Sequence, residues 1–260
     1  MTGERVVRED RDGIVVLSIN RPEAHNALNR EVMEQLAAHI EACRFDESVR
    51  SVILTGSDRV FCAGADIGAF DALREETLFG PRRASGDALW AGLGSFQKPL
   101  IAAVEGVAFG GGCELALACD TVVAGESARF AVPEVQLGVI PGGGGTQRLV
   151  AAIGKAKAMA MLLTGDSMNA RDAESAGLVA SVAPAGEALD AALRMARRIA
   201  RNSPLAVALA KDSASAALRP SLSLGLEYER RNFHVALRSD DSHEGQHAFL
   251  DKRTPLFNGR

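Results

Sequence analysis

Short apolar runs alternate with helix-like segments along the first two thirds of the chain, and this alternation limits the fold more than any other feature. Residues 29–44 have the 3.6-residue apolar period of an amphipathic helix, and residues 146–163 also read as helical, with a break at Gly154. Strands that alternate with helices predict an α/β fold. The predicted strands are residues 13–20 (GIVVLSIN), 51–56 (SVILTG), 100–106 (LIAAVEG) and 120–125 (DTVVAG).

The character of the sequence changes after residues 181–184 (SVAP), where an Ala- and Arg-rich helical pattern begins. Turn residues interrupt this pattern at 202–204 (NSP) and 219–221 (RPS). We therefore divide the chain into an α/β core, residues 1–200, and an all-helical segment, residues 201–260. A helical tail behind a complete α/β core needs a partner surface for its apolar faces, which predicts an oligomer.

Composition excludes several classes of protein. A chain of 260 residues that is 47% hydrophobic and 24% charged is long enough to bury a large core. The net charge of −4 gives no electrostatic basis for binding nucleic acid or an anionic membrane. No signal-peptide pattern and no membrane-spanning apolar run is evident, so we expect a cytoplasmic protein. The cysteines at 43, 62, 113 and 119 have no metal-site or C-x-x-C spacing and are expected to be reduced thiols, mostly in the core.

The glycine-rich segments do not fit the common nucleotide-binding motifs. A G-x-G-x-x-G fingerprint fails at Leu115 in one segment and at Gln147 in the other. Lys155 follows a glycine but precedes Ala156, so a P-loop is excluded, and the hydrolase motif G-x-S-x-G does not occur.

Residues 109–120 (FGGGCELALACD) place three glycines before a predicted helix. The first N–H groups of a helix have no intrahelical acceptor, so the Gly111 N–H is a candidate donor to an oxyanion. Glu114 lies three residues further on, on the same helical face, and would place a carboxylate beside the polarised oxygen. The alternative is that Glu114 only complements the helix dipole.

Two other segments offer related features. Residues 60–68 (VFCAGADIG) surround Gly64 with small residues, where a backbone N–H can turn toward a ligand. Glu134 follows Pro133 in an otherwise apolar neighbourhood, although a glutamate at such a turn is more often simply solvated.

Six segments in order and spacing resemble the crotonase superfamily, the enoyl-CoA hydratases and isomerases. The resemblance implies a spiral of ββα units with a C-terminal helical trimerisation region, assembled as a homotrimer or as a homohexamer, a dimer of trimers. The six segments are 24–29 (AHNALN), 61–67 (FCAGADI), 102–120, 133–149, 163–179 and 244–253 (EGQHAFLDKR).

The resemblance also implies roles for individual residues. The N–H groups of Ala65 and Gly111 would form the oxyanion hole for a thioester carbonyl, and Glu114 and Glu134 would be the acid and base. Lys252 has the alternative role of an exposed lysine. The positions that would contact coenzyme A are Ala24, Ala63, Asp66 and Ile67, with Phe249 and Lys252 reaching the CoA of a neighbouring subunit.

The implied reaction is hydration of 2-trans-enoyl-CoA to 3-hydroxyacyl-CoA, with no metal and no cofactor other than the CoA carried by the substrate. Water addition needs a base for the water and an acid for Cα, so two glutamates favour a hydratase. The alternatives are a Δ3-Δ2 enoyl-CoA isomerase, which can use one acid, and another crotonase-type enzyme such as a carnitinyl-CoA dehydratase. Val132 and residues 69–96 depart from the family pattern, which leaves the acyl group undefined.

A different class of enzyme is suggested by residues 243–247 (HEGQH), which fit the zinc-protease pattern H-E-x-x-H. A zinc site also needs a third ligand, and Asp251 is the sole acid after this segment. The run DDSHEG reads instead as the start of a helix, with Asp241 and Glu244 spaced as a capping pair.

Overall fold

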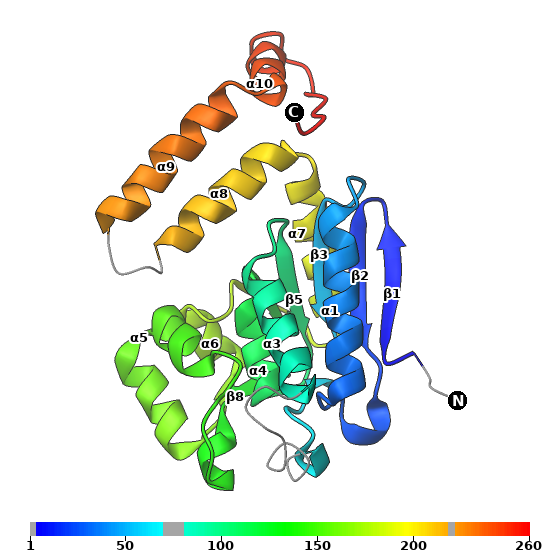
Figure 1. Cartoon of the computed structure of the whole chain (residues 1–260), viewed down its shortest axis with the longest axis vertical. Coiled ribbons are helices and arrows are strands. Elements are labelled where there is room, and N and C mark those ends of the chain that lie inside the picture. The colour runs from blue at the N-terminus through cyan, green and yellow to red at the C-terminus, as the bar shows by residue number, and fades with distance from the viewer. Residues whose placement is uncertain (1–3, 70–80, 218–221) are drawn as a thin grey trace.

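The computed structural model describes residues 4–69, 81–217 and 222–260, and its central feature is a six-stranded sheet (Figure 1). β1 and β2 are antiparallel, whereas the other neighbours in this sheet are parallel. The four strands expected from the sequence are confirmed as β2, β3, β5 and β7. In order across the sheet the strands are β1 (Val6–Arg11), β2 (Ile14–Ile19), β3 (Ser51–Thr55), β5 (Leu100–Val104), β7 (Thr121–Gly125) and β10 (Ser181–Ala183).

A second, smaller sheet gives the chain a repeated path. Three successive units each send one strand to the large sheet and the next strand to the small sheet, and then turn into helix. This is the ββα path that the resemblance implies. The small sheet is β4 (Val60–Cys62), β6 (Val107–Phe109), β8 (Arg129–Ala131) and β9 (Met168–Asn169); the helices that follow the units are α3 (Pro81–Gly94), α4 (Gly111–Ala118) and, after the 3-10 turn η3 (Pro133–Leu137), α5 (Gly145–Thr164).

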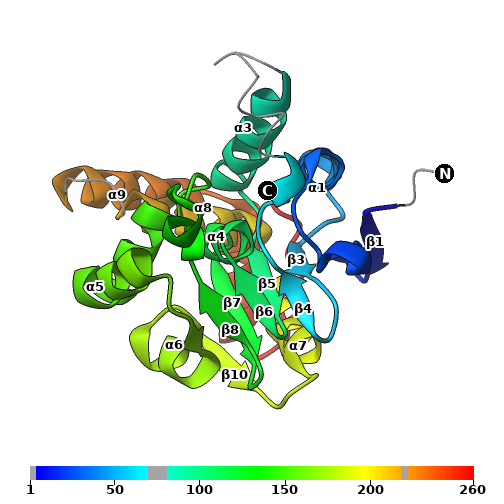
Figure 2. The same ribbon diagram turned by 90° about the horizontal axis from the view of Figure 1, so that it is seen from below.

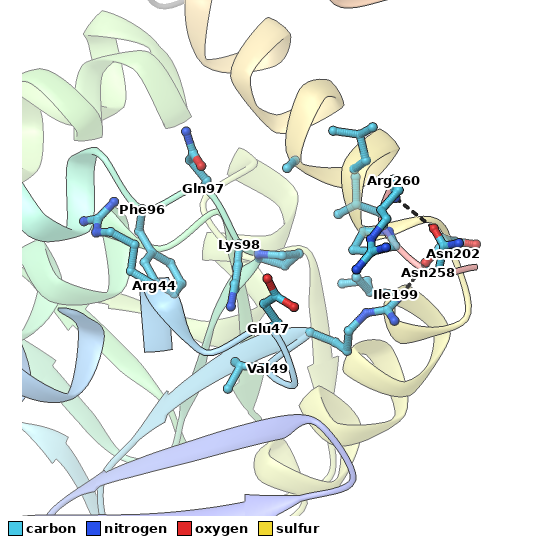
Figure 3. Close-up of a pocket in the computed structure, with 17 residues that line it drawn as sticks. Arg44, Glu47, Val49, Phe96, Gln97, Lys98, Ile199, Asn202, Asn258 and Arg260 are labelled. Atoms are coloured by element: carbon cyan, nitrogen blue, oxygen red, sulfur yellow. Dashed lines mark hydrogen bonds between the residues drawn. The ribbon is translucent and has the colours of Figure 1, made fainter. Parts of the chain in front are cut away.

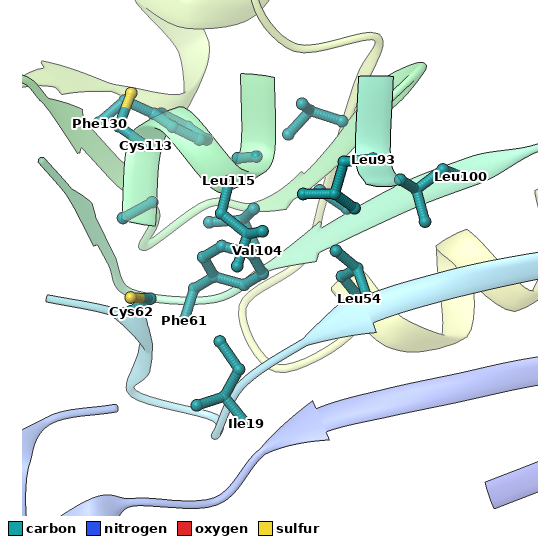
Figure 4. Close-up of a cluster of buried hydrophobic side chains, with 14 of the residues drawn as sticks. Ile19, Leu54, Phe61, Cys62, Leu93, Leu100, Val104, Cys113, Leu115 and Phe130 are labelled. Atoms are coloured by element: carbon teal, nitrogen blue, oxygen red, sulfur yellow. The ribbon is translucent and has the colours of Figure 1, made fainter. Parts of the chain in front are cut away.

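Both faces of the large sheet are buried, which explains why its strands read as continuous apolar runs. Neighbouring side chains point to opposite faces: Val52 and Leu54 enter the larger cluster, whereas Ile53 packs toward α7 (Ala188–Ala200). Figure 4 shows part of the larger cluster, and Figure 2 shows α1 (Arg30–Phe45) and α3 on one side of β3, with α7 on the other. All four cysteines are free and three are buried, as expected.

The two predicted helices of the core are α1 and α5. The Asn29 side chain caps α1, because its Oδ1 accepts a hydrogen bond from the Val32 N–H at 2.9 Å. Val32, Leu36 and Ile40 recur every four residues and are buried, so one stripe of the helix covers the sheet. The break predicted in α5 is confirmed at Gly154, where φ is 74° and ψ is 161°.

Beyond the short α6 (Ala170–Ala176) and α7, the chain ends in three helices that project from the sheets (Figure 1). The expected start of the helical segment at residue 201 falls between α7 and α8, although the division into a core and an oligomerisation segment stays a prediction. Among the described helices, none has the length and apolar character needed to cross a membrane. The three helices are α8 (Pro204–Ala216), α9 (Leu222–Leu237) and α10 (Asp240–Leu250).

The start of α10 was placed correctly, but its predicted cap is wrong. The cap is Ser239, whose Oγ accepts from the Ser242 N–H at 3.0 Å. The Asp241 carboxylate instead accepts the N–H groups of Asn258 and Gly259 from the end of the chain. The carboxylate of Asp241, which the local spacing predicts as a cap, therefore makes a tertiary contact with the chain end instead.

The turn between β5 and β6 gives a test of the packing between the ββα units. Gly106 has a φ of +59°, and a Cβ built there would lie 1.7 Å from the carbonyl oxygen of Arg59. Gly106→Ala is expected to lower the free energy of unfolding by about 3 kcal/mol or more, because main-chain atoms must move to relieve the contact.

Gly186→Ala is the matched control. Its φ of +85° is also left-handed, but its Cβ would meet nothing within 4 Å. The expected loss is only about 1 kcal/mol, from the backbone conformation alone. Both losses are measured by urea unfolding, and equal values would contradict the proposed contact with Arg59.

Candidate active site

The N-terminus of α4 lies directly against the end of β4. A Cβ built at Gly112 would lie 2.1 Å from the Cys62 carbonyl oxygen, so this approach requires glycine. One residue earlier, a Cβ built at Gly111 would lie 3.5 Å from the Ala65 nitrogen. The close packing therefore brings the two predicted oxyanion donors, Ala65 and Gly111, side by side.

The loop that carries Ala65 is held by Leu28. The Leu28 N–H donates to the Gly64 carbonyl at 2.7 Å, and the Asp66 N–H donates to the Leu28 carbonyl at 3.0 Å. In such a parallel bridge the residue between the two bonded groups turns its own N–H to the opposite side. Within the described part of the chain, neither the Ala65 N–H nor the Gly111 N–H donates a hydrogen bond. Both donors are thus free to bind a ligand oxygen.

Glu114 is a buried carboxylate in a fixed position. It lies in the first turn of α4, is only 3% exposed, and its Oε1 accepts hydrogen bonds from the N–H groups of Gly143 and Gly145, both at 2.7 Å. These two donors were missed in the sequence, where the glycine run 142–145 was considered only as a nucleotide motif. The signal was available, since several consecutive glycines expose main-chain N–H groups to close approach.

Glu134 reaches the same place from another unit. It lies in η3, directly after β8, and its Oε1 would be 3.1 Å from a Cβ built at Gly110. Its Oε2 is buried and has no hydrogen-bond partner among the described residues. Burial raises the pKa of the Glu134 carboxyl, and the nearby charge of Glu114 raises it further. A carboxyl in this environment is suited to hold a proton.

The predicted CoA contacts fall into two groups. Ala24, Ala63, Asp66 and Ile67 lie on the segments beside Ala65: the Ala63 N–H donates to the His25 carbonyl, and Asp66 pairs with Arg21 at 2.7 Å. The Ile67 side chain is 60% exposed. A second group, Phe249 and Lys252, is exposed at the end of α10, on the far side of the helical segment from α4 (Figure 1).

The structure describes one of the two departures from the family pattern, Val132, completely and the other, residues 69–96, only in part. Val132 is fully buried in the core and precedes Glu134 in the turn that leads into η3. Of the segment 69–96, residues 70–80 lie outside the described residues.

A separate cleft of about 280 Å³ lies where β3 and β5 begin (Figure 3). Two of its basic side chains already bind main-chain carbonyls: Arg50 donates to Asn202, and Lys98 donates to Cys43 and Asp46. Neither Glu114 nor Glu134 lines it. This cleft is therefore no candidate for the acid–base chemistry.

The H-E-x-x-H segment does not assemble a zinc site. Glu244 forms two hydrogen bonds with Arg253, at 2.6 and 2.8 Å, and these lower its pKa to about 2. Throughout residues 4–69, 81–217 and 222–260, no three His, Cys, Asp or Glu side chains are grouped to hold a metal.

Known proteins with similar sequence or structure include several described as enoyl-CoA hydratases. The family model for enoyl-CoA hydratase/isomerase matches residues 9–260. The chain is 47% identical over 247 residues to 2,3-dehydroadipyl-CoA hydratase of Escherichia coli (strain K12), across 95% of this chain and 96% of that protein. It is 44% identical over 260 residues to the probable enoyl-CoA hydratase echA8 of Mycobacterium bovis, across 100% of both.

A solved structure agrees with these relatives. The crystal structure of an enoyl-CoA hydratase from Bacillus anthracis is 34% identical and superposes with a TM-score of 0.92, covering 99% of this chain and 100% of that one. These likenesses confirm the predicted crotonase-type α/β fold.

The raised pKa of Glu134 predicts a pH-dependent cost to stability. The folded protein holds the Glu134 proton more tightly than the unfolded chain, so wild type loses stability as pH rises from the ordinary pKa of 4.5 through the raised value. Glu134→Gln removes this loss. The stability advantage of the variant is expected to grow over that pH interval and then to level off, as measured by urea unfolding at a series of pH values. An advantage that does not change with pH would contradict the raised pKa.

Proposed function

Because the chain belongs to the enoyl-CoA hydratase/isomerase family, we propose that it hydrates 2-trans-enoyl-CoA thioesters to 3-hydroxyacyl-CoA. One observation carries this proposal: two differently held glutamates lie beside two backbone N–H groups that are free to bind an oxygen. Hydration adds the elements of water without oxidation or reduction, so its chemical step needs a base, an acid and donors to the carbonyl oxygen, and these four groups can supply them.

The N–H groups of Ala65 and Gly111 bind the thioester carbonyl oxygen. When a water oxygen attacks Cβ, the electrons of the Cα–Cβ double bond move toward this carbonyl, and negative charge grows on its oxygen. Two N–H donors that are already in position stabilise that charge without reorganisation. Gly111 is the first residue of α4, so the helix dipole adds a favourable field for this charge.

Glu114 and Glu134 divide the proton transfers. Glu114 is ordered by two N–H donors, so its carboxylate takes the proton from the attacking water. Glu134, whose pKa is raised by burial, delivers a proton to Cα as the enolate collapses. The product carries a hydroxyl on Cβ and a new hydrogen on Cα.

We assign the CoA moiety to the surface beside the loop that carries Ala65. The contacts within the same subunit are the residues that border Ala65, namely Ala24, Ala63, Asp66 and Ile67. The contacts with the CoA of a neighbouring subunit are Phe249 and Lys252. Their exposure fits contact with a ligand that lies outside the core. No metal and no further cofactor take part in this scheme, which runs in the cytoplasm.

A Δ3-Δ2 isomerase is the second candidate, since the family model covers both activities. Glu134 alone, with its raised pKa, could move a proton between two carbons of an enoyl chain. The fixed carboxylate of Glu114 favours the hydratase, because isomerisation needs no activated water. Neither candidate defines the acyl group, so the assay uses 2-enoyl-CoA thioesters of graded length together with 2,3-dehydroadipyl-CoA, the compound named for the Escherichia coli relative.

Replacing either glutamate by glutamine separates the two activities. Glu114→Gln and Glu134→Gln are each expected to lower kcat for hydration of crotonyl-CoA by about 10²- to 10⁴-fold, because a positioned acid or base is lost. The double variant should fall little further, since the two groups act as one unit. Loss of the conjugated chromophore measures the rate, and Glu187→Gln, an exposed glutamate before α7, is the control.

Isomerisation of a 3-enoyl-CoA distinguishes the two candidates. Any isomerase activity should depend mainly on Glu134 and should survive in Glu114→Gln. Hydration at a near wild-type rate by folded Glu114→Gln would overturn the hydratase assignment and favour the isomerase.

The helical segment predicts the assembly. Its exposed apolar side chains include Phe233, 59% exposed, and Leu237, 44% exposed, and such surface calls for a partner. We expect a homotrimer or homohexamer, with a mass three or six times 27.3 kDa by light scattering. Phe233→Asp should shift this mass toward the monomer, whereas Phe45→Asp, 75% exposed at the end of α1, should not. A wild-type monomer at micromolar concentration would contradict the assembly.

A further inference from the structure

The glycine run 142–145 supplies the N–H donors that bind Glu114, yet its own sequence gives it little conformational stability. Glycine loses more conformational freedom on folding than any other residue, and this run provides no side chain to pack. Gly144 precedes α5 with a φ of +102°, and no side chain caps that end of the helix. The rigidity that Glu114 requires must therefore come from neighbouring elements.

Arg148, one turn into α5, supports the run on one side. Its Nη1 donates to the Gly143 carbonyl at 2.6 Å, and the same atom would lie 2.2 Å from a Cβ built at Gly144. Gly143 thus accepts a hydrogen bond from Arg148 through its carbonyl and donates one to Glu114 through its N–H. Within the described residues no carboxylate pairs with Arg148, so its charge is directed at this carbonyl.

Trp90, from α3, supports the same residue on another side. A Cβ built at Gly143 would lie 2.5 to 2.8 Å from three atoms of the indole ring. The ring therefore packs directly on the glycine backbone and blocks it from moving toward α3. Trp90 is partly buried and joins the larger core cluster, so this contact is continuous with the interior.

We propose that Arg148 and Trp90 are positioning residues for Glu114, because they fix Gly143 from α5 and α3 while its N–H holds the carboxylate on α4. This inference rests on the proposed function for its effect on rate, but the contact itself is independent of the reaction. Neither side chain is assigned contact with the substrate. Both act through a main-chain group that is already bonded to Glu114.

The kinetic test uses Arg148→Met, which keeps the length of the side chain and removes the donor. The expected result is a fall in kcat for crotonyl-CoA hydration of about tenfold to a hundredfold with KM unchanged, since a catalytic group displaced by about 1 Å can cost that much. Arg148→Lys, which restores one donor, should recover part of the rate. Arg194→Gln, an exposed arginine on α7, is the control.

A double variant shows whether Arg148 acts through Glu114 or only through the general stability of the fold. In a Glu114→Gln background, Arg148→Met should have no further effect on kcat. A raised KM in both backgrounds would mean that Arg148 contacts the substrate, and it would overturn the proposal.

Amide hydrogen exchange tests the contact without any activity. Exchange across residues 142–145 should rise in Arg148→Met and in Trp90→Leu, but not in Arg194→Gln. Unchanged exchange in both variants would overturn the proposal even if the chain is an active hydratase. If exchange rises but wild type hydrates no enoyl-CoA, then the positioning contact is supported and the proposed function fails.

Discussion

The candidate site depends on one close approach between main chains, that of α4 to the end of β4. Gly112 lies so near the Cys62 carbonyl oxygen that any side chain would separate the two segments. The contact places the Gly111 N–H beside the Ala65 N–H and turns the first helical turn, with Glu114, toward the glycine run. The absence of a Cβ at position 112 thus determines both the positions of the two oxyanion donors and the orientation of one carboxylate.

The two glutamates show how one residue type serves two tasks through its surroundings. Glu114 is more deeply buried, but its Oε1 accepts hydrogen bonds from two main-chain N–H groups. Glu134 is less buried, yet one of its oxygens lacks a partner and its pKa is raised. The difference does not come from burial alone. It comes from which main-chain groups each carboxyl meets.

Sequence patterns predicted the parts of the molecule that depend on neighbouring residues. The strands of the large sheet and α1 carry clear periods, and Glu114 was identified from its place in a helical first turn. The short strands β6 and β8 have three residues each, too few for a period, and β1 is a charged edge strand. The glycine run that binds Glu114 is visible in the sequence, but its members lie 29 and 31 residues from Glu114, and Asp241 is bound by the chain end. The sequence therefore shows the possible donors, and the folded structure shows which carboxylate each one meets.

The repeated ββα path has a consequence for how the protein is made. Ala65 follows the strands of the first unit, Gly111 and Glu114 follow those of the second, and Glu134 follows those of the third. No single unit contains the site. A nascent chain that has emerged only as far as α4 holds both N–H donors and one carboxylate, but it lacks the other carboxylate and the glycines that order the first. The site is therefore complete only when the third unit, as far as Gly145 at the start of α5, has packed against the first two.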